Sequence, residues 1–210
     1  MLKKCPCPLC GASATVFYQD RYYHCKICDL IFLHADFHLS LADEKAIYDL
    51  HENSPTDLAY RKFLSQLTEP LLERMVAPAD VLDFGCGPGP TVSVMLAEAG
   101  LSVANYDPLY FPDVSVLDET YNAITATEVF EHLSAPASVM TDLMEILKKP
   151  GYLGLMTALH AGKKAFPDWG YKHDPTHITF YSEKTMRWIE KKCALEIAYL
   201  TNRVVIFATN

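Results

Sequence analysis

The sequence predicts an α/β domain, built on a mainly parallel sheet with helices on both faces, that follows a small cysteine-rich module. Short apolar runs alternate with amphipathic segments from residue 81 onward, a glycine-rich turn directly follows the first run, and five of the seven cysteines fall in the first 28 residues. A chain of 210 residues has room for one main domain and a small appendage. We therefore expect a cysteine module over 1–36, a helical cap over 37–77 and the main domain over 78–210.

Two Cys-x-x-Cys pairs flank a predicted hairpin near the N-terminus. Fourteen residues separate the pairs and include strand-like segments at 15–18 and 22–24. Two tight turns that each present two thiolates suit tetrahedral zinc. A segment of about 30 residues has too small a hydrophobic core to fold unless a bound metal ion cross-links it. We predict a zinc ribbon with four ligands: Cys7, Cys10, Cys25 and Cys28. Cys5 and His24 are alternative ligands that would break the symmetry of the two pairs.

The cap is expected to contain two helices. Residues 41–50 look helical, and 58–75 place Leu64, Leu67 and Leu71 at the spacing of one helix face. Pro70 is expected to kink or split the second helix, because proline removes a backbone donor. We expect these helices to cover the mouth of the main domain.

Seven strands are predicted for the main sheet. The expected strands are 81–84, 102–106, 114–117, 123–128, 151–157, 195–200 and 204–209, the last two forming an antiparallel hairpin. Helices are expected at 91–99, ended by Gly100, at 136–147, and after Ser182 as N-cap. Repeated strand–helix–strand units favour parallel pairing.

The most informative segment is the turn Asp83-Phe84-Gly85-Cys86-Gly87-Pro88-Gly89, between a strand and a helix. Glycines there let a ligand approach the backbone closely. Pro90 stands where a dinucleotide fingerprint needs its third glycine, which disfavours an NAD oxidoreductase. Asp107, at the end of the second strand, can accept hydrogen bonds from both hydroxyls of a ribose.

Three segments in order, 81–89, 105–108 and 128–133, resemble the class I S-adenosylmethionine-dependent methyltransferases. The resemblance implies a Rossmann-like fold and the cofactor S-adenosylmethionine. It also implies that Asp83 lies near the amino group of the cofactor and that Asp107 holds its ribose. The other residues implied in cofactor binding are Gly85, Cys86, Gly87 and Gly89, around the methionine part, and Thr127 and Glu128, along the floor.

Catalysis is predicted beyond the strand at 123–128, because ligands of such sheets bind at the carboxyl ends of the strands. His132 is the first choice for a general base, with Glu131 orienting it, and His177 is an alternative; each histidine could equally serve packing. The segment 169–181 resembles a substrate lid of ubiquinone-pathway and sugar-modifying methyltransferases. Expected substrate contacts are Tyr60, Trp169, Tyr171 and His173.

The net charge of the chain favours one class of methyl acceptor. Eighteen basic and 26 acidic side chains give a formal charge of −8, which argues against broad binding of a phosphate backbone and favours a small-molecule acceptor. An RNA methyltransferase and a non-catalytic module that binds S-adenosylmethionine and docks a partner remain as alternatives. No run approaches the roughly 18 apolar residues that span a bilayer, and the N-terminus lacks the apolar core of a signal peptide, so a cytoplasmic protein without membrane contact is expected.

Overall fold

The computed structural model describes residues 4–50 and 53–210 and contains two sheets. The larger is a six-stranded mixed sheet in the order β10-β11-β8-β7-β5-β6. Its strands are β5 (Asp80–Phe84), β6 (Ser102–Tyr106), β7 (Tyr121–Thr127), β8 (Leu147–Met156), β10 (Glu196–Leu200) and β11 (Val204–Thr209). The four neighbouring strands β6, β5, β7 and β8 pair in parallel, and β11 pairs antiparallel with both β8 and β10. This confirms the α/β class and the closing hairpin.

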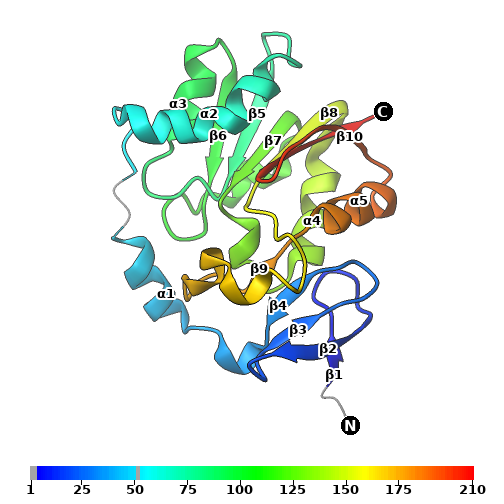
Figure 1. Ribbon diagram of the computed structural model, residues 1–210. Helices are drawn as coiled ribbons and strands as arrows, with labels where there is room; N and C mark the ends of the chain where they lie inside the picture. Colours follow the sequence, from blue (N-terminus) through cyan, green and yellow to red (C-terminus); the bar gives the residue numbers. More distant parts are fainter. Residues whose placement is uncertain (1–3, 51–52) are drawn as a thin grey trace.

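Helices cover both faces of this sheet (Figure 1). One face carries α2 (Leu58–Leu72) and α3 (Thr91–Glu98), whose apolar residues pack with Val81 and Ile206. The other carries α4 (Pro136–Ile146) and α5 (Glu183–Lys192), which pack with Leu82 and Phe207. Neighbours such as Val81 and Leu82 face opposite ways because strand side chains alternate.

Two sequence predictions are wrong. Residues 114–117 do not form a seventh strand, because Val114–Asp118 is a 3-10 helix, η2, that Asp113 caps by accepting from the Ser115 amide at 3.0 Å. The edge of the sheet is therefore β6. Of the two outcomes expected at Pro70, a split of the helix is wrong: α2 runs unbroken from Leu58 to Leu72 although Pro70 cannot donate a backbone hydrogen bond, and the helix ends two residues later.

The N-terminal module forms a second, five-stranded antiparallel sheet that borrows one strand from far along the chain. It consists of β1 (Lys4–Pro6), β2 (Ser13–Tyr18), β3 (Tyr22–His24), β4 (Ile31–Leu33) and β9 (Thr179–Phe180). Pairing of β4 with β9 joins the module to the segment that precedes α5. Between the sheets run the 3-10 helix η1 (Ala35–Phe37) and α1 (Leu41–Tyr48).

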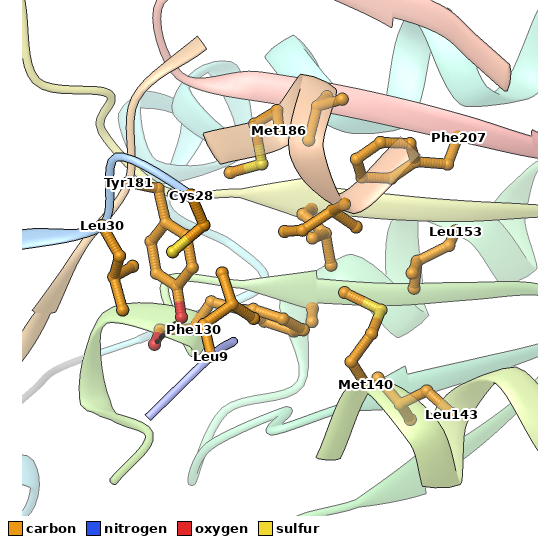
Figure 2. Close-up of a cluster of buried hydrophobic side chains, with 14 of the residues drawn as sticks. Leu9, Cys28, Leu30, Phe130, Met140, Leu143, Leu153, Tyr181, Met186 and Phe207 are labelled. Atoms are coloured by element: carbon orange, nitrogen blue, oxygen red, sulfur yellow. Dashed lines mark hydrogen bonds between the residues drawn. The ribbon is translucent and has the colours of Figure 1, made fainter. Parts of the chain in front are cut away.

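One apolar core continues from the main sheet into the N-terminal module. Figure 2 shows Leu9 and Cys28 of the module beside Phe130 and Tyr181, with Met140 of α4 farther along the same layer. Phe130 and Tyr181 are fully buried. The module is thus attached both by strand pairing and by shared apolar packing.

Three further 3-10 helices lie at the carboxyl edge of the main sheet or in the loop before β9: η3 (Phe130–His132), η4 (Phe166–Asp168) and η5 (Gly170–His173). Among the described residues, no helix combines the length and apolar character needed to cross a membrane.

Candidate active site

The residues predicted to bind ligands converge at one edge of the main sheet. Gly85, Asp107, Glu128 and Thr157 each directly follow one of the four parallel strands. Parallel strands end at a common edge, so residues that are far apart in the sequence meet there.

The glycine turn has the conformation that its sequence predicts. Gly85 and Gly87 have φ values of +73° and +64°, a region that side chains disfavour. A Cβ on Gly85 would lie 2.4 Å from Val129, and one on Gly89 would lie 1.9 Å from the carbonyl oxygen of Asn53. The turn is therefore packed against the segment after β7 on one side and against the connection between α1 and α2 on the other.

Asp107 joins the glycine turn to the segment after β6. Its Oδ2 accepts a hydrogen bond from the Gly87 amide at 3.0 Å, and its Oδ1 accepts from the amides of Leu109 and Tyr110 at 2.8 and 3.1 Å. Each carboxylate oxygen has two lone pairs, so Oδ2 keeps one acceptor site for a further donor.

Asp83 lies beneath the turn, and both of its carboxylate oxygens contact side-chain hydroxyls. Thr125 donates to its Oδ1 at 2.9 Å, and the Ser93 hydroxyl lies 3.0 Å from its Oδ2 with Asn105 Oδ1 as a second acceptor for the same proton. Burial raises the pKa of Asp83 to about 6. The hydroxyl of Thr127, at the end of β7, is buried without a hydrogen-bond partner in the described chain, and burial raises the pKa of the nearby Cys86 thiol.

Glu131, His132 and His177, the three predicted catalytic residues, come together. One ligand atom from each lies within 4.8 Å of the others. Glu131 and His132 belong to η3, directly after β7, and the His132 and His177 rings have centroids 4.8 Å apart. Burial lowers the pKa of both histidines.

Two carboxylates share the hydroxyl of Tyr171. It donates to Glu131 Oε1 and lies 3.0 Å from Glu128 Oε2, although a phenol has only one proton to give. Burial raises the pKa of Glu128 to about 7, and the neighbouring Glu131 charge adds to the shift. Burial also raises the pKa of Glu131 to about 7.

The other residues predicted to contact the substrate differ in whether they lie near this cluster. Tyr60 stacks on Phe63 in α2, and Trp169 packs against Tyr171 with ring centroids 5.1 Å apart. His173 is exposed and contacts Lys172, so it is not brought to the cluster. The loop is held in place by the buried ammonium of Lys172, which donates to the carbonyls of Pro167 and Trp169 at 2.7 and 3.0 Å.

Helix α1, one of the two helices expected to cover the mouth of the main domain, lies against the cluster. The other, α2, packs on a face of the main sheet instead, because its apolar residues Leu64, Leu67 and Leu71 are buried there. The ring of Tyr48 in α1 meets His132 edge-on, with centroids 5.3 Å apart. A hollow of about 250 Å³ lies beside His132, lined also by Leu41, Glu44 and Thr176.

The four predicted zinc ligands form a compact cluster in the N-terminal module. Cys7 and Cys28 have sulfurs 3.5 Å apart, Cys10 and Cys25 have sulfurs 3.4 Å apart, and all four lie within 4.8 Å. Tetrahedral zinc with bonds of about 2.3 Å separates its sulfur ligands by about 3.8 Å, so the residues fit the ion. Cys5 is not part of this cluster, and His24 pairs instead with Asp29 at 2.8 Å.

A model for a family described as "Methyltransferase domain" matches residues 57–199, which is more than half of the chain. The chain belongs to this methyltransferase family. A search of curated proteins finds no match.

Solved methyltransferases share the fold of this methyltransferase at low identity. The 1,6-didemethyltoxoflavin N1-methyltransferase of Burkholderia thailandensis, solved with that substrate and S-adenosylhomocysteine, has a TM-score of 0.57 at 13% identity, covering 89% of this chain and 98% of its own. The magnesium protoporphyrin IX methyltransferase of Synechocystis PCC 6803, solved with S-adenosylhomocysteine, has a TM-score of 0.50 at 17% identity, covering 80% and 94%. These likenesses establish the fold alone.

Sequence reasoning missed Arg203 in this methyltransferase. Its guanidinium binds both carboxylate oxygens of Glu128, at 2.9 and 3.1 Å, and lies over the ring of Tyr171. The register of the sheet explains its position: Val204 pairs with Met156, so the turn before β11 lies beside the carboxyl end of β8. A cation in that turn is therefore expected at the site edge.

Proposed function

We propose that this protein transfers the methyl group of S-adenosylmethionine to a small-molecule acceptor. The observation that carries the proposal is the hydrogen bond of 3.0 Å between the Gly87 amide and Asp107, which unites the glycine turn and the acidic residue at the carboxyl edge of the sheet. The family match and the S-adenosylhomocysteine bound by the solved relatives support it.

Several residues are suited to hold the cofactor. The turn of Gly85, Cys86, Gly87 and Gly89 would hold the cofactor with its backbone at Gly87, which has room beside it, whereas Val129 and Asn53 lie against Gly85 and Gly89. The buried hydroxyl of Thr127, which has no partner among the described residues, can bond a polar group at the floor. Asp107 retains an acceptor site for a ribose hydroxyl. Asp83 lies beneath the glycine turn, bonded to Thr125, and would support the turn rather than contact the cofactor directly. S-adenosylmethionine supplies an electrophilic methyl group on a sulfonium sulfur.

We place the acceptor beside Glu131, His132 and His177. An acceptor hydroxyl must lose its proton as the methyl group arrives, and these three side chains present acceptor atoms within 4.8 Å of one another. Tyr171 and Trp169 would form a wall of this subsite. Glu128 already binds Arg203 and contacts the Tyr171 hydroxyl, which helps to hold Tyr171 in place. Because its oxygens are taken up in this way, Glu128 is less suited to contact the cofactor.

Calorimetry with S-adenosylmethionine and S-adenosylhomocysteine tests the proposal. Asp107→Ala should weaken binding by about tenfold to a hundredfold, as expected when a buried hydrogen-bond partner is lost. Asp113→Ala is the matched control, because Asp113 caps a turn with the same kind of bond but lies outside the site. Equal binding by wild-type protein and Asp107→Ala, or no binding by either, would refute the proposal. A labelled-methyl screen of sugar nucleotides, quinone precursors and RNA then identifies the acceptor.

Zinc is proposed as the structural ion of the N-terminal module. The four sulfurs of Cys7, Cys10, Cys25 and Cys28 form a soft, compact ligand set, and two of the contacts between them, 3.4 and 3.5 Å, are close to the spacing that zinc imposes. Elemental analysis should find one zinc per chain at this cluster, and replacement of all four cysteines by serine should remove it.

A further inference from the structure

The two histidines of the cluster are held in one defined tautomer. His132 Nδ1 lies 3.1 Å from the Thr176 carbonyl, and His177 Nδ1 lies 2.7 Å from the Tyr171 carbonyl. A carbonyl oxygen only accepts, so in both rings Nδ1 carries the hydrogen. In the neutral rings, both Nε2 atoms therefore present lone pairs.

The carboxylate of Glu131 completes the set. The residue is fully buried, and its Oε1 accepts a hydrogen bond from Tyr171. Its Oε2 is buried without a hydrogen-bond partner anywhere in the described chain. A buried carboxylate oxygen left in this state is costly, and a cation would satisfy it.

This arrangement is one that metal sites use. Metal-binding histidines commonly donate their other ring N–H to a backbone carbonyl, and metal-binding carboxylates are themselves hydrogen-bonded, which fixes the direction of the free atoms. Both features occur here in three side chains that come from two separate segments.

We propose that Glu131, His132 and His177 bind one divalent transition-metal ion through Oε2 and the two Nε2 atoms. Two imidazoles and one carboxylate suit manganese, iron, cobalt or zinc better than calcium or magnesium. Two ligands at about 2.1 Å from one ion are at most about 4.2 Å apart. One ligand atom from each of the three side chains already lies within 4.8 Å of the others, so small side-chain rotations would bring the set onto one ion.

The proposal deepens the function assigned above and rests on it for its chemical meaning. Three protein ligands leave coordination positions for the acceptor, which points to an oxygen acceptor with two neighbouring oxygens, such as a phenol or enol beside a carbonyl. A coordinated hydroxyl loses its proton to water more readily than a free one. Its oxygen then bonds to the methyl carbon while the bond from that carbon to sulfur breaks, leaving a thioether. In the metal-bound state the histidines are ligands, not bases.

Binding of Mn²⁺ alone, measured by electron paramagnetic resonance on the zinc-loaded full chain, tests the site. Manganese avoids the all-thiolate cluster, so only the second site should remove free Mn²⁺ from the spectrum. Wild-type protein should bind one ion per chain. Glu131→Gln and His177→Gln should each weaken binding about tenfold or more.

His34→Gln is the matched control, because His34 and Asp36 form a histidine–carboxylate pair at 3.3 Å without a third ligand. It should bind Mn²⁺ like wild-type protein. No uptake by wild-type protein at about 1 mM free Mn²⁺ overturns the proposal, whatever the variants do. So does uptake by both folded cluster variants equal to that of wild type. Calorimetry with S-adenosylhomocysteine on the same samples reports on the proposed methyl transfer separately, so the two failures are distinguishable.

Discussion

A single buried carboxyl group ties stability to pH in this protein. Asp83 has 2% of its surface exposed, and its pKa is about 6 instead of 3.8. A carboxyl group whose pKa is raised by folding contributes stability below its unfolded pKa and loses that contribution as pH rises through the folded value. The whole contribution is about 3 kcal/mol, of which about half remains at pH 5.

Asp83→Asn should therefore become more favourable as pH rises. Asparagine stays neutral, so the free energy of unfolding of the variant relative to wild type should increase by about 1 kcal/mol between pH 5 and pH 8. Urea unfolding at both pH values measures the difference. Asp113→Asn is the control: hydrogen bonds from Ser115 lower the pKa of the exposed Asp113, so it titrates below this range and its effect should not change. A constant effect of Asp83→Asn would contradict the prediction.

At the scale of the elements, the N-terminus of α5 is hydrogen-bonded to the N-terminal module. Ser182 accepts a hydrogen bond from the Thr185 amide at 3.2 Å and donates to Asp29 Oδ2 at 2.7 Å. Asp29 also binds His24 of β3 at 2.8 Å. The cap of one helix is thus part of the contact between the two sheets.

Ser182→Ala should cost about 2–3 kcal/mol, because it removes a cap and a bond to a half-buried carboxylate. Ser40→Ala is matched to it: Ser40 caps α1 through the Asp43 amide at 3.2 Å but is exposed, so its loss should cost about 1 kcal/mol or less. Chemical denaturation of the two variants gives the comparison. Equal costs would show that the bond to Asp29 adds nothing.

Most elements of the main sheet could be predicted because their signals are local. Buried parallel strands show as short apolar runs, and the glycine turn and the Ser182 cap mark where helices begin. The predicted strand at 114–117 was wrong because Asp113 caps a turn there, and a local polar bond outweighed a short apolar run. Strand β9 has two residues, too few for any periodic pattern to appear.

The candidate site was predictable where it follows from topology. Glu131 and His132 come directly after a parallel strand, so their place at the sheet edge follows from the predicted fold. Arg203 required the register of β11 against β8, which only the structure supplies. The burial of Lys172 had no sequence signal, since its partners are carbonyl oxygens that any residue can offer.

At the scale of the whole molecule, the N-terminal module and the catalytic domain share one core. Cys7, Cys25 and Cys28 are buried in the same apolar cluster as Phe130 and Tyr181, and β4 pairs with β9. Phe130 lies next to Glu131 in η3, and Ile178, between His177 and β9, donates its amide hydrogen to the Glu131 carbonyl at 2.8 Å. Loss of order in the module would therefore reach the cluster of Glu131, His132 and His177 directly.

Removal of the proposed zinc should consequently unfold both parts together. Binding of a structural zinc contributes free energy to the folded state, so a chelator should lower the melting temperature of the whole chain rather than only that of residues 4–33. Zinc release and the fluorescence of Trp169 and Trp188, which lie in the catalytic part, should change at the same temperature. Cys28→Ser should reproduce the chelator effect, whereas Cys193→Ser, a half-buried thiol at the end of α5, should leave zinc content unchanged. If zinc were released at a temperature well below that of an unchanged tryptophan transition, the methyltransferase domain would be stable without the metal. The shared core would then not couple the N-terminal module to that domain.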